Sequence, residues 1–193
     1  MKVYFSGSAS TGKTSLARYV ANKYQLPFLT ETARQILSEQ ELQIDQLRCN
    51  LETANNYQRA VFNRQLQEEN KYSSFVSDRA AIDILAYAGN YANILPELLL
   101  RSELPTYIES LKLPDSILFL VSPFKQTMAQ DGTRETLSFS DIISIHAQIK
   151  LLLEMWNIRY FQISMPNMSE RIKLIDGVLS LVKEINYEQK INQ

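Results

Sequence analysis

The residues most able to do chemistry lie near the start of the chain, in the stretch FSGSASTGKTS at positions 5–15. They have the P-loop spacing, which is one glycine, four residues and then Gly-Lys-Thr. The backbone N–H groups of such a loop turn toward an anion, and the following helix adds the partial positive charge of its N-terminus. The alternative is a glycine-rich turn that only caps a helix. We favour a binding site for ATP, which comprises Gly7, Ser10, Thr11, Gly12, Lys13, Thr14 and Ser15.

Side chains of this loop have distinct expected roles. Lys13 is placed to reach the β- and γ-phosphates, and Ser15 to donate a hydrogen bond near the α-phosphate. The Thr14 hydroxyl is placed to bind Mg²⁺, the cation that accompanies such phosphates. We expect a second ligand for this cation at Asp78, where the apolar stretch SFVSD (74–78) ends.

The residue after Asp78 separates the main classes of P-loop protein. A GTPase reads its base with Asn-Lys-x-Asp, and the stretch NKYQ at 22–25 lacks the aspartate. A motor typically carries Asp-Glu after an apolar strand, with the glutamate activating water, whereas Asp78 is followed by Arg79. Because an arginine binds anions rather than activating water, the sequence favours phosphoryl transfer to an acceptor over hydrolysis.

A carboxylate follows the apolar stretch PFLT (27–30): Glu31, with Arg34 one helical turn later. Such a carboxylate can accept a proton from an acceptor hydroxyl or orient that hydroxyl. The alternative is helix capping, with Thr30 as the cap and Glu31 in the first turn. We favour the functional interpretation because, in a parallel sheet, this position lies beside the P-loop.

A polar segment at 122–140 is a candidate lid that closes over ATP. Arg134 is its best placed cation for the transferring phosphoryl group, and Lys125 is a weaker candidate. The alternative is a solvated surface loop with an Asp-Gly turn.

The surrounding pattern predicts how these residues are positioned. Short apolar runs at 2–6, 27–30, 74–78, 116–122 and 159–164 are typical of strands, and helical patterns lie at 13–24, 51–72 and 172–182. Strands of this kind alternating with amphipathic helices predict an α/β fold: a five-stranded parallel sheet with helices on both faces, in three layers. Ligands of such sheets bind at the carboxyl ends of the strands.

Composition bounds the remaining possibilities. The chain has 193 residues, 45% of them hydrophobic, and a net charge of −1, which fits a single domain over 1–193 and gives no overall charge for binding duplex nucleic acid or an anionic membrane. We expect no membrane span, because no apolar run approaches about 18 residues. Cys49 is the single cysteine, and the first residues do not resemble a signal peptide. We therefore expect a cytoplasmic protein, and a homodimer is left open.

The motifs GSASTGKTS, ETAR, SDRAAIDILAYA and DGTRE, followed by the closing strand IRYFQI, resemble those of P-loop nucleoside and nucleotide kinases, particularly the ribosylnicotinamide kinase domains. The resemblance implies an ATP site at 7–15, a lid arginine at Arg134, and an acceptor-side pair in Glu31 and Arg34. In that family a helix borders the acceptor pocket, which places Gln58 and Arg59 there, with a solvated helix face as the alternative.

SDR at 77–79 resembles instead the thymidylate and deoxynucleoside kinases. An arginine at 79 suits an acceptor that already carries phosphate, so a nucleoside monophosphate is favoured over an unphosphorylated nucleoside. The expected catalytic set is Lys13, Glu31, Asp78, Arg79 and Arg134. A polynucleotide 5′-kinase and a regulatory ATPase that acts on a protein partner are the alternatives.

Overall fold

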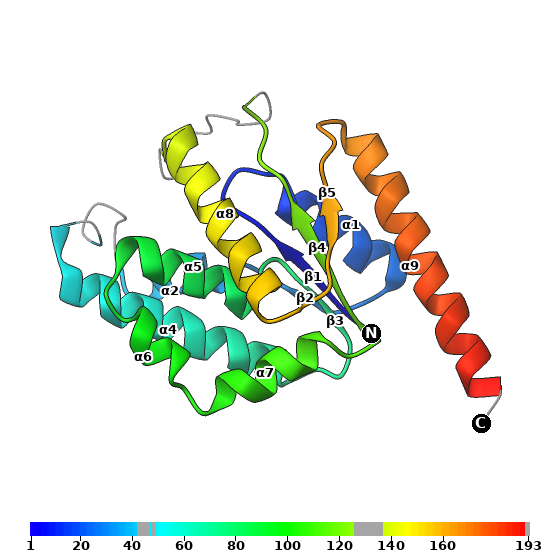
Figure 1. Cartoon of the computed structure of the whole chain (residues 1–193), viewed down its shortest axis with the longest axis horizontal. Helices are drawn as coiled ribbons and strands as arrows, with labels where there is room; N and C mark the ends of the chain where they lie inside the picture. The colour runs from blue at the N-terminus through cyan, green and yellow to red at the C-terminus, as the bar shows by residue number, and fades with distance from the viewer. Residues whose placement is uncertain (42–46, 48, 126–136, 192–193) are drawn as a thin grey trace.

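A parallel sheet organises the molecule, whose computed structural model describes residues 1–41, 47, 49–125 and 137–191. In these ranges five strands pair in the order β2-β3-β1-β4-β5. Their bounds are β1 (Lys2–Ser6), β2 (Phe28–Leu29), β3 (Phe75–Ser77), β4 (Ser116–Val121) and β5 (Phe161–Ile163). The central strand β1 therefore has β3 on one side and β4 on the other (Figure 1).

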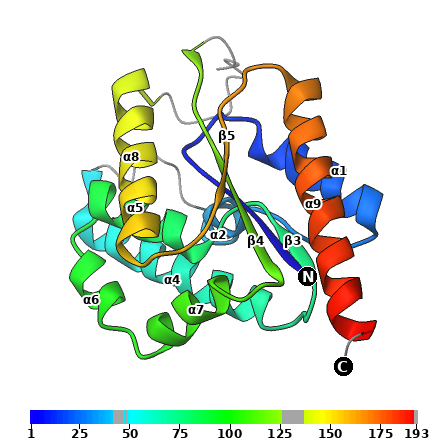
Figure 2. The ribbon, with the colours of Figure 1, turned by 45° about the vertical axis from the view of Figure 1, so that its right-hand side comes forward.

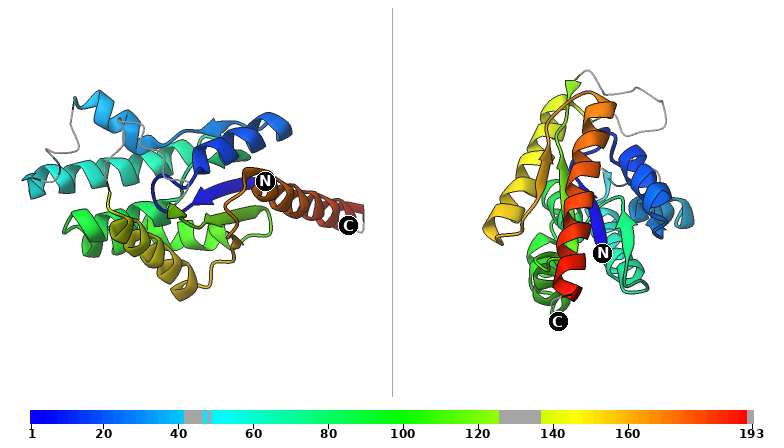
Figure 3. Two further views of the ribbon diagram at one scale, coloured as in Figure 1. Left: turned by 90° about the horizontal axis from the view of Figure 1, so that it is seen from above. Right: turned by 90° about the vertical axis from the view of Figure 1, so that its right-hand side faces the viewer.

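Helices cover both faces of this sheet. Their bounds are α1 (Lys13–Tyr24), α2 (Thr32–Glu39), α4 (Leu51–Glu69), α5 (Ala81–Tyr91), α6 (Leu95–Leu99), α7 (Glu103–Leu111), α8 (Phe139–Met155) and α9 (Met168–Ile191). Figure 2 shows α1 and α9 on one side of the strands, with α4, α5 and α8 on the other. In the right-hand view of Figure 3, α9 lies in front and runs alongside the sheet.

Alternation along the strands separates two cores. Val3 and Phe5 of β1 pack with Leu16 of α1 and Ile175 of α9, whereas Tyr4 faces the opposite layer of helices. This is the two-residue period of a strand that is buried on both faces. The three-layer α/β fold with five parallel strands, predicted from the sequence, is thus confirmed.

The predicted elements agree closely with the observed ones. The helix predicted over 13–24 is α1, and the long helix predicted over 51–72 is α4, which ends three residues earlier, at Glu69. Among the described residues, no helix is long and apolar enough to cross a membrane. The single-domain assignment over 1–193 stays a prediction.

Candidate active site

The P-loop connects β1 to α1 and has the backbone that its glycines allow. Gly7 has φ of 136° and Gly12 has φ of 88°, a region that favours glycine. A Cβ atom on Gly7 would lie 2.6 Å from the carbonyl oxygen of Val121 on the neighbouring strand β4. The first glycine therefore serves both the turn and the close approach of two backbones.

Lys13, the first residue of α1, is buried against its own loop. Its Nζ donates to the carbonyl oxygen of Ser8 at 2.5 Å and to Thr11 Oγ1 at 3.3 Å. Burial, together with the charge of Arg79, lowers the pKa of Lys13 from its usual 10.5 to about 8, against the opposing charges of nearby carboxylates. Its ammonium group thus lies within the loop that would hold phosphates.

Thr14 and Asp78 meet between the P-loop and the end of β3. Thr14 Oγ1 donates to Asp78 Oδ2 at 2.5 Å. A hydroxyl and one carboxylate suit Mg²⁺, which takes few protein ligands and completes its octahedron with waters and phosphate oxygens. Among the described residues no cluster of three or more histidine, cysteine or acidic side chains could hold a metal by itself. The hydroxyl of Thr14 and the carboxylate of Asp78 are nevertheless ligands of the type that Mg²⁺ takes beside phosphates and waters.

Glu31 stands at the end of β2 and faces the P-loop side of the sheet. It is the N-cap residue of α2, but its carboxylate makes no capping hydrogen bond, and the Thr30 hydroxyl instead accepts one from Gln35. Glu31 Oε1 lies 2.7 Å from Nη2 of Arg79. Its Oε2 lies 2.9 Å from Nε of Arg34. The observed carboxylate thus pairs with two arginines rather than capping the helix.

The charges around Glu31 keep it ionised. Burial by itself would raise its pKa, but the charges of Arg79, Lys13 and Arg34 outweigh burial and lower the pKa to about 2. Burial acts to lower the pKa of Arg79, yet the charge of Glu31 holds it well above its usual value. Both groups of the buried pair are therefore charged at neutral pH.

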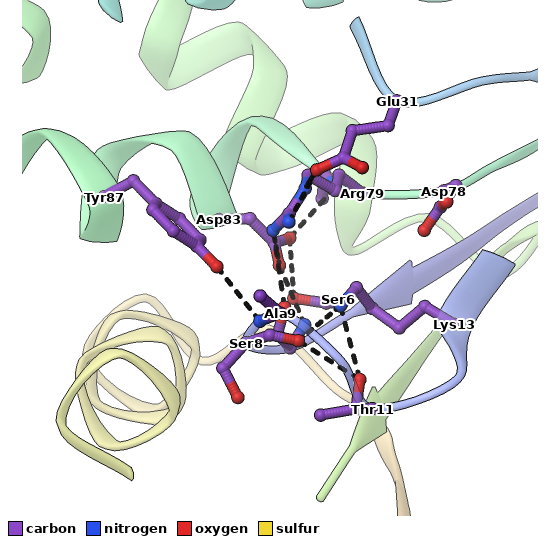
Figure 4. A network of polar contacts seen from close by, with 12 residues as sticks. Ser6, Ser8, Ala9, Thr11, Lys13, Glu31, Asp78, Arg79, Asp83 and Tyr87 are labelled. Carbon is purple, nitrogen blue, oxygen red and sulfur yellow. Dashed lines mark hydrogen bonds and ion pairs between the residues drawn. The ribbon is translucent and has the colours of Figure 1, made fainter. Parts of the chain in front are cut away.

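Two further residues of this network were not predicted as site residues: Asp83 and Tyr87 of α5. Asp83 accepts hydrogen bonds from Ser6 Oγ and from the backbone N–H of Gly7, both at 2.8 Å, and Tyr87 Oη accepts one from the N–H of Ala9 at 3.0 Å. The guanidinium of Arg79 lies 4.8 Å from the centre of the Tyr87 ring. Figure 4 shows Arg79 between Glu31 and the loop, with Asp83 and Tyr87 beside it.

The sequence contained a signal for these two residues of α5. Positions 83 and 87 are four residues apart, which places their side chains on one face of α5, and Arg79 lies in the turn just before this helix. Arg79 itself has φ of 127°, although it is not a glycine. A strained backbone held by polar contacts on several sides is typical of functional sites.

A cavity of about 1080 Å³ connects the P-loop to this network. The predicted residues that line it are Ser10, Thr11, Gly12, Lys13, Thr14, Ser15, Glu31, Arg34, Gln58, Asp78 and Arg79. The far part is largely apolar and includes Leu37, Leu51, Ala54, Tyr57 and Val61. The structure therefore brings the donor loop and most of the predicted acceptor residues to one cavity.

Some predicted residues lie elsewhere. Arg59 does not line the cavity: it pairs with Glu97 through bonds of 2.8 and 2.7 Å on the surface, so the structure favours the solvated-face alternative at this position. Lys125 is exposed. Arg134 and most of the candidate lid lie outside the described residues. Beyond that segment, Ser138 and Asp141 at the start of α8 line the cavity, which the sequence did not predict.

The strand order and the P-loop after the central strand define the class of protein: a P-loop kinase fold. A family model described as an AAA domain matches residues 2–171, and the chain belongs to this family. No curated protein matches the sequence.

Solved structures with the same fold include several kinases. The NadR protein in complex with NR is 20% identical with a TM-score of 0.66, covering 85% of this chain and 45% of NadR. Deoxyadenosine kinase from M. mycoides, solved with its products, is 11% identical with a TM-score of 0.68, covering 94% of this chain and 100% of that one. Shikimate kinase from Acinetobacter baumannii is 14% identical with a TM-score of 0.54, covering 95% and 93%. This chain spans about half the length of NadR.

Proposed function

We propose that the protein is an ATP-dependent kinase that transfers the γ-phosphoryl group to a hydroxyl of a nucleoside. The observation that carries this proposal is the buried carboxylate of Glu31, held by Arg79 and Arg34 in the same cavity as the P-loop lysine. A hydrolytic motor has no need for such a carboxylate at this position, whereas a kinase must orient an acceptor hydroxyl.

Each residue has a role that follows from its position. Lys13 and the loop N–H groups bind the β- and γ-phosphates, and Thr14 with Asp78 binds Mg²⁺. The nucleotide supplies the phosphoryl group, and the cation neutralises charge on its oxygens. Asp83 and Tyr87 hold the loop from α5. Arg134 would add positive charge from the lid, a prediction about a segment that the structure does not describe.

Glu31 acts by orienting the acceptor. A carboxylate with a pKa of about 2 is a weak base, so its main contribution is to accept a hydrogen bond from the attacking hydroxyl. The bond from the hydroxyl oxygen to the γ-phosphorus forms, the bond to the β–γ bridging oxygen breaks, and the hydroxyl proton passes to solvent. Positioning of this kind supplies most of the catalysis in phosphoryl transfer.

An unphosphorylated acceptor fits the charge balance better than a monophosphate. Among the described residues that line the cavity, three are cationic (Lys13, Arg34, Arg79) and three anionic (Glu31, Asp78, Asp141). A second phosphate would have to take Arg79 from Glu31 and leave an ionised carboxylate beside a dianion. The Glu31–Arg79 pair thus favours the nucleoside over the monophosphate that the sequence favoured.

The solved neighbours support an acceptor of the nucleoside or nucleotide class. NadR was solved with NR and, separately, with NAD and AMP-PNP, and the deoxyadenosine kinase with dCMP and dCDP. The buried amide of Gln58 lines the acceptor part of the cavity, where an amide can pair with the edge of a base.

The test is ADP production measured against nucleosides, nucleoside monophosphates, shikimate and 5′-hydroxyl oligonucleotides. We expect acceleration by nucleosides and its loss in Lys13→Ala. Glu31→Gln should lower kcat by about 10²-fold, as the loss of a positioning contact does, and leave ATP affinity nearly unchanged. Acceleration by monophosphates alone would refute the nucleoside proposal, and acceleration by oligonucleotides alone would indicate a polynucleotide 5′-kinase. Slow ATP hydrolysis that no acceptor changes would indicate a regulatory ATPase.

A further inference from the structure

A buried glutamine on α4 lies beneath the two segments that carry Glu31 and Arg79. Gln65 is 1% exposed. Its Oε1 accepts a hydrogen bond from Thr32 Oγ1 at 3.1 Å, and Thr32 directly follows Glu31. Its Nε2 donates to the main-chain carbonyl of Arg79 at 3.3 Å. One amide thus contacts both the start of α2 and the turn between β3 and α5.

The contact of Gln65 with Glu69 determines the orientation of its amide. Glu69, one turn along α4, accepts hydrogen bonds from the hydroxyls of Tyr4 at 2.9 Å and Tyr107 at 3.2 Å. Glu69 Oε1 also accepts from Gln65 Nε2 at 2.8 Å. The NH₂ group of the amide thus faces Glu69, and the amide oxygen faces the hydroxyl of Thr32.

The contact with Arg79 falls on a strained residue. A φ of 127° is a strained conformation for a non-glycine residue, and it persists only when its surroundings hold it. The side chain of Arg79 is held by Glu31, and its main-chain carbonyl by Gln65. Gln65 therefore acts on the backbone of one partner of the ion pair, and through Thr32 on the segment that carries the other.

We propose that Gln65 is a positioning residue that sets the geometry of the Glu31–Arg79 pair, and so of the acceptor hydroxyl. It does not touch the cavity, so its effect passes through the two segments. The proposal rests on the proposed kinase function for its effect on rate, but its effect on the ion pair is independent of any substrate.

Three variants separate positioning from general support of the fold. Gln65→Met keeps the length of the side chain and removes its hydrogen bonds to Thr32 and Arg79 together with those to Ser77 and Glu69. Thr32→Val keeps the shape of Thr32 and removes only the contact at α2. Tyr4→Phe is the matched control, because it deletes one buried hydrogen bond of the same network and leaves every contact of Gln65 in place.

In the nucleoside-dependent assay we expect Gln65→Met to lower kcat by about 10–100-fold, as a displaced catalytic group does, with little change in the KM for ATP. Thr32→Val should lower kcat less, and Tyr4→Phe should match the wild type. If Gln65→Met does not fold, Thr32→Val still tests the hydrogen bond between Thr32 and Gln65. A wild-type kcat in Thr32→Val, or an equal loss in Tyr4→Phe, overturns the proposal.

A second measurement needs no activity. The Nε–H of Arg79, which donates to Glu31 Oε1 at 2.8 Å, should give a protected NMR signal. We expect the signal in the wild type and Tyr4→Phe, its loss in Glu31→Ala, and its loss or weakening in Gln65→Met and Thr32→Val. If no acceptor accelerates the wild type, the proposed function fails and this signal still decides the role of Gln65. An unchanged signal in both Gln65→Met and Thr32→Val would refute that role.

Discussion

The buried carboxyl of Glu69 makes the stability of this protein depend on pH near neutrality. Burial raises its pKa from the usual 4.5 to about 7, and the hydrogen bonds from Gln65, Tyr4 and Tyr107 only partly oppose burial. Below pH 4.5 the group is protonated in both the folded and the unfolded chain. Above pH 7 it is ionised in both, and the folded protein bears the full cost of burying the charge.

The cost follows from the two pKa values. The difference between 4.5 and about 7 corresponds to a limit of about 3–4 kcal/mol, at about 1.4 kcal/mol per pKa unit. Between about pH 5 and about pH 8 the folded protein loses about 2–3 kcal/mol of this amount. Glu69→Gln removes the charge, so its stability relative to the wild type should rise by about that amount over the same interval.

Urea unfolding of both proteins at the two pH values measures this difference, and constant effects of the substitution cancel. Glu68→Gln is the matched control, because Glu68 is the neighbouring residue on α4 and pairs on the surface with Lys71. Its difference from the wild type should stay within about 0.5 kcal/mol at both pH values. If the gap between Glu69→Gln and the wild type is the same at both pH values, Glu69 is not buried as described.

Three further substitutions test other parts of the site. Thr14→Val deletes the hydroxyl beside Asp78, so the Mg²⁺ concentration for half-maximal activity should rise by about tenfold, equivalent to about 1.4 kcal/mol; an unchanged value would remove Thr14 from the cation site. Arg59→Ala removes only surface contacts, with Glu97 and Asn56, so the acceptor KM and the melting temperature should stay near wild type; a raised KM would indicate that Arg59 contacts the acceptor. Gly7→Ala places a Cβ 2.6 Å from a carbonyl oxygen at φ of 136°, which should lower stability by at least about 1–3 kcal/mol in thermal unfolding; wild-type stability would contradict the close packing of β1 and β4.

The parts of the site that local sequence could predict are those that depend on local chemistry. The spacing of Gly7, Gly12 and Lys13 specifies a turn and a helix start within a few residues, and α1 begins at Lys13 as predicted. Apolar runs identified all five strands, and with them the positions of Glu31 and Asp78 at strand ends. These inferences need only the neighbours of each residue along the chain.

The partner of Arg79 was beyond such reasoning. Pairing it with Glu31 requires β2 to lie next to β3, an order that alternating strands and helices do not specify. Considered alone, an arginine at a strand end in a kinase is expected to bind phosphate. The carboxylate of Glu31, 48 residues away in sequence, changes that expectation because it already pairs with the guanidinium of Arg79 without a substrate.

Helix register explains the difference between Gln58 and Arg59. Adjacent residues on a helix point about 100° apart, so one of them faces the cavity and the other the solvent. Gln58, Gln65 and Glu69 lie seven and four residues apart, on the same buried face of α4 as Ala54 and Val61. A periodicity search that counts polar residues as solvent-facing overlooks them. Polar residues that continue an apolar stripe predict buried polar contacts, because burying such residues is costly unless they bind partners. On α4 that signal marks both the acceptor cavity, at Gln58, and the polar network beneath it, at Gln65 and Glu69.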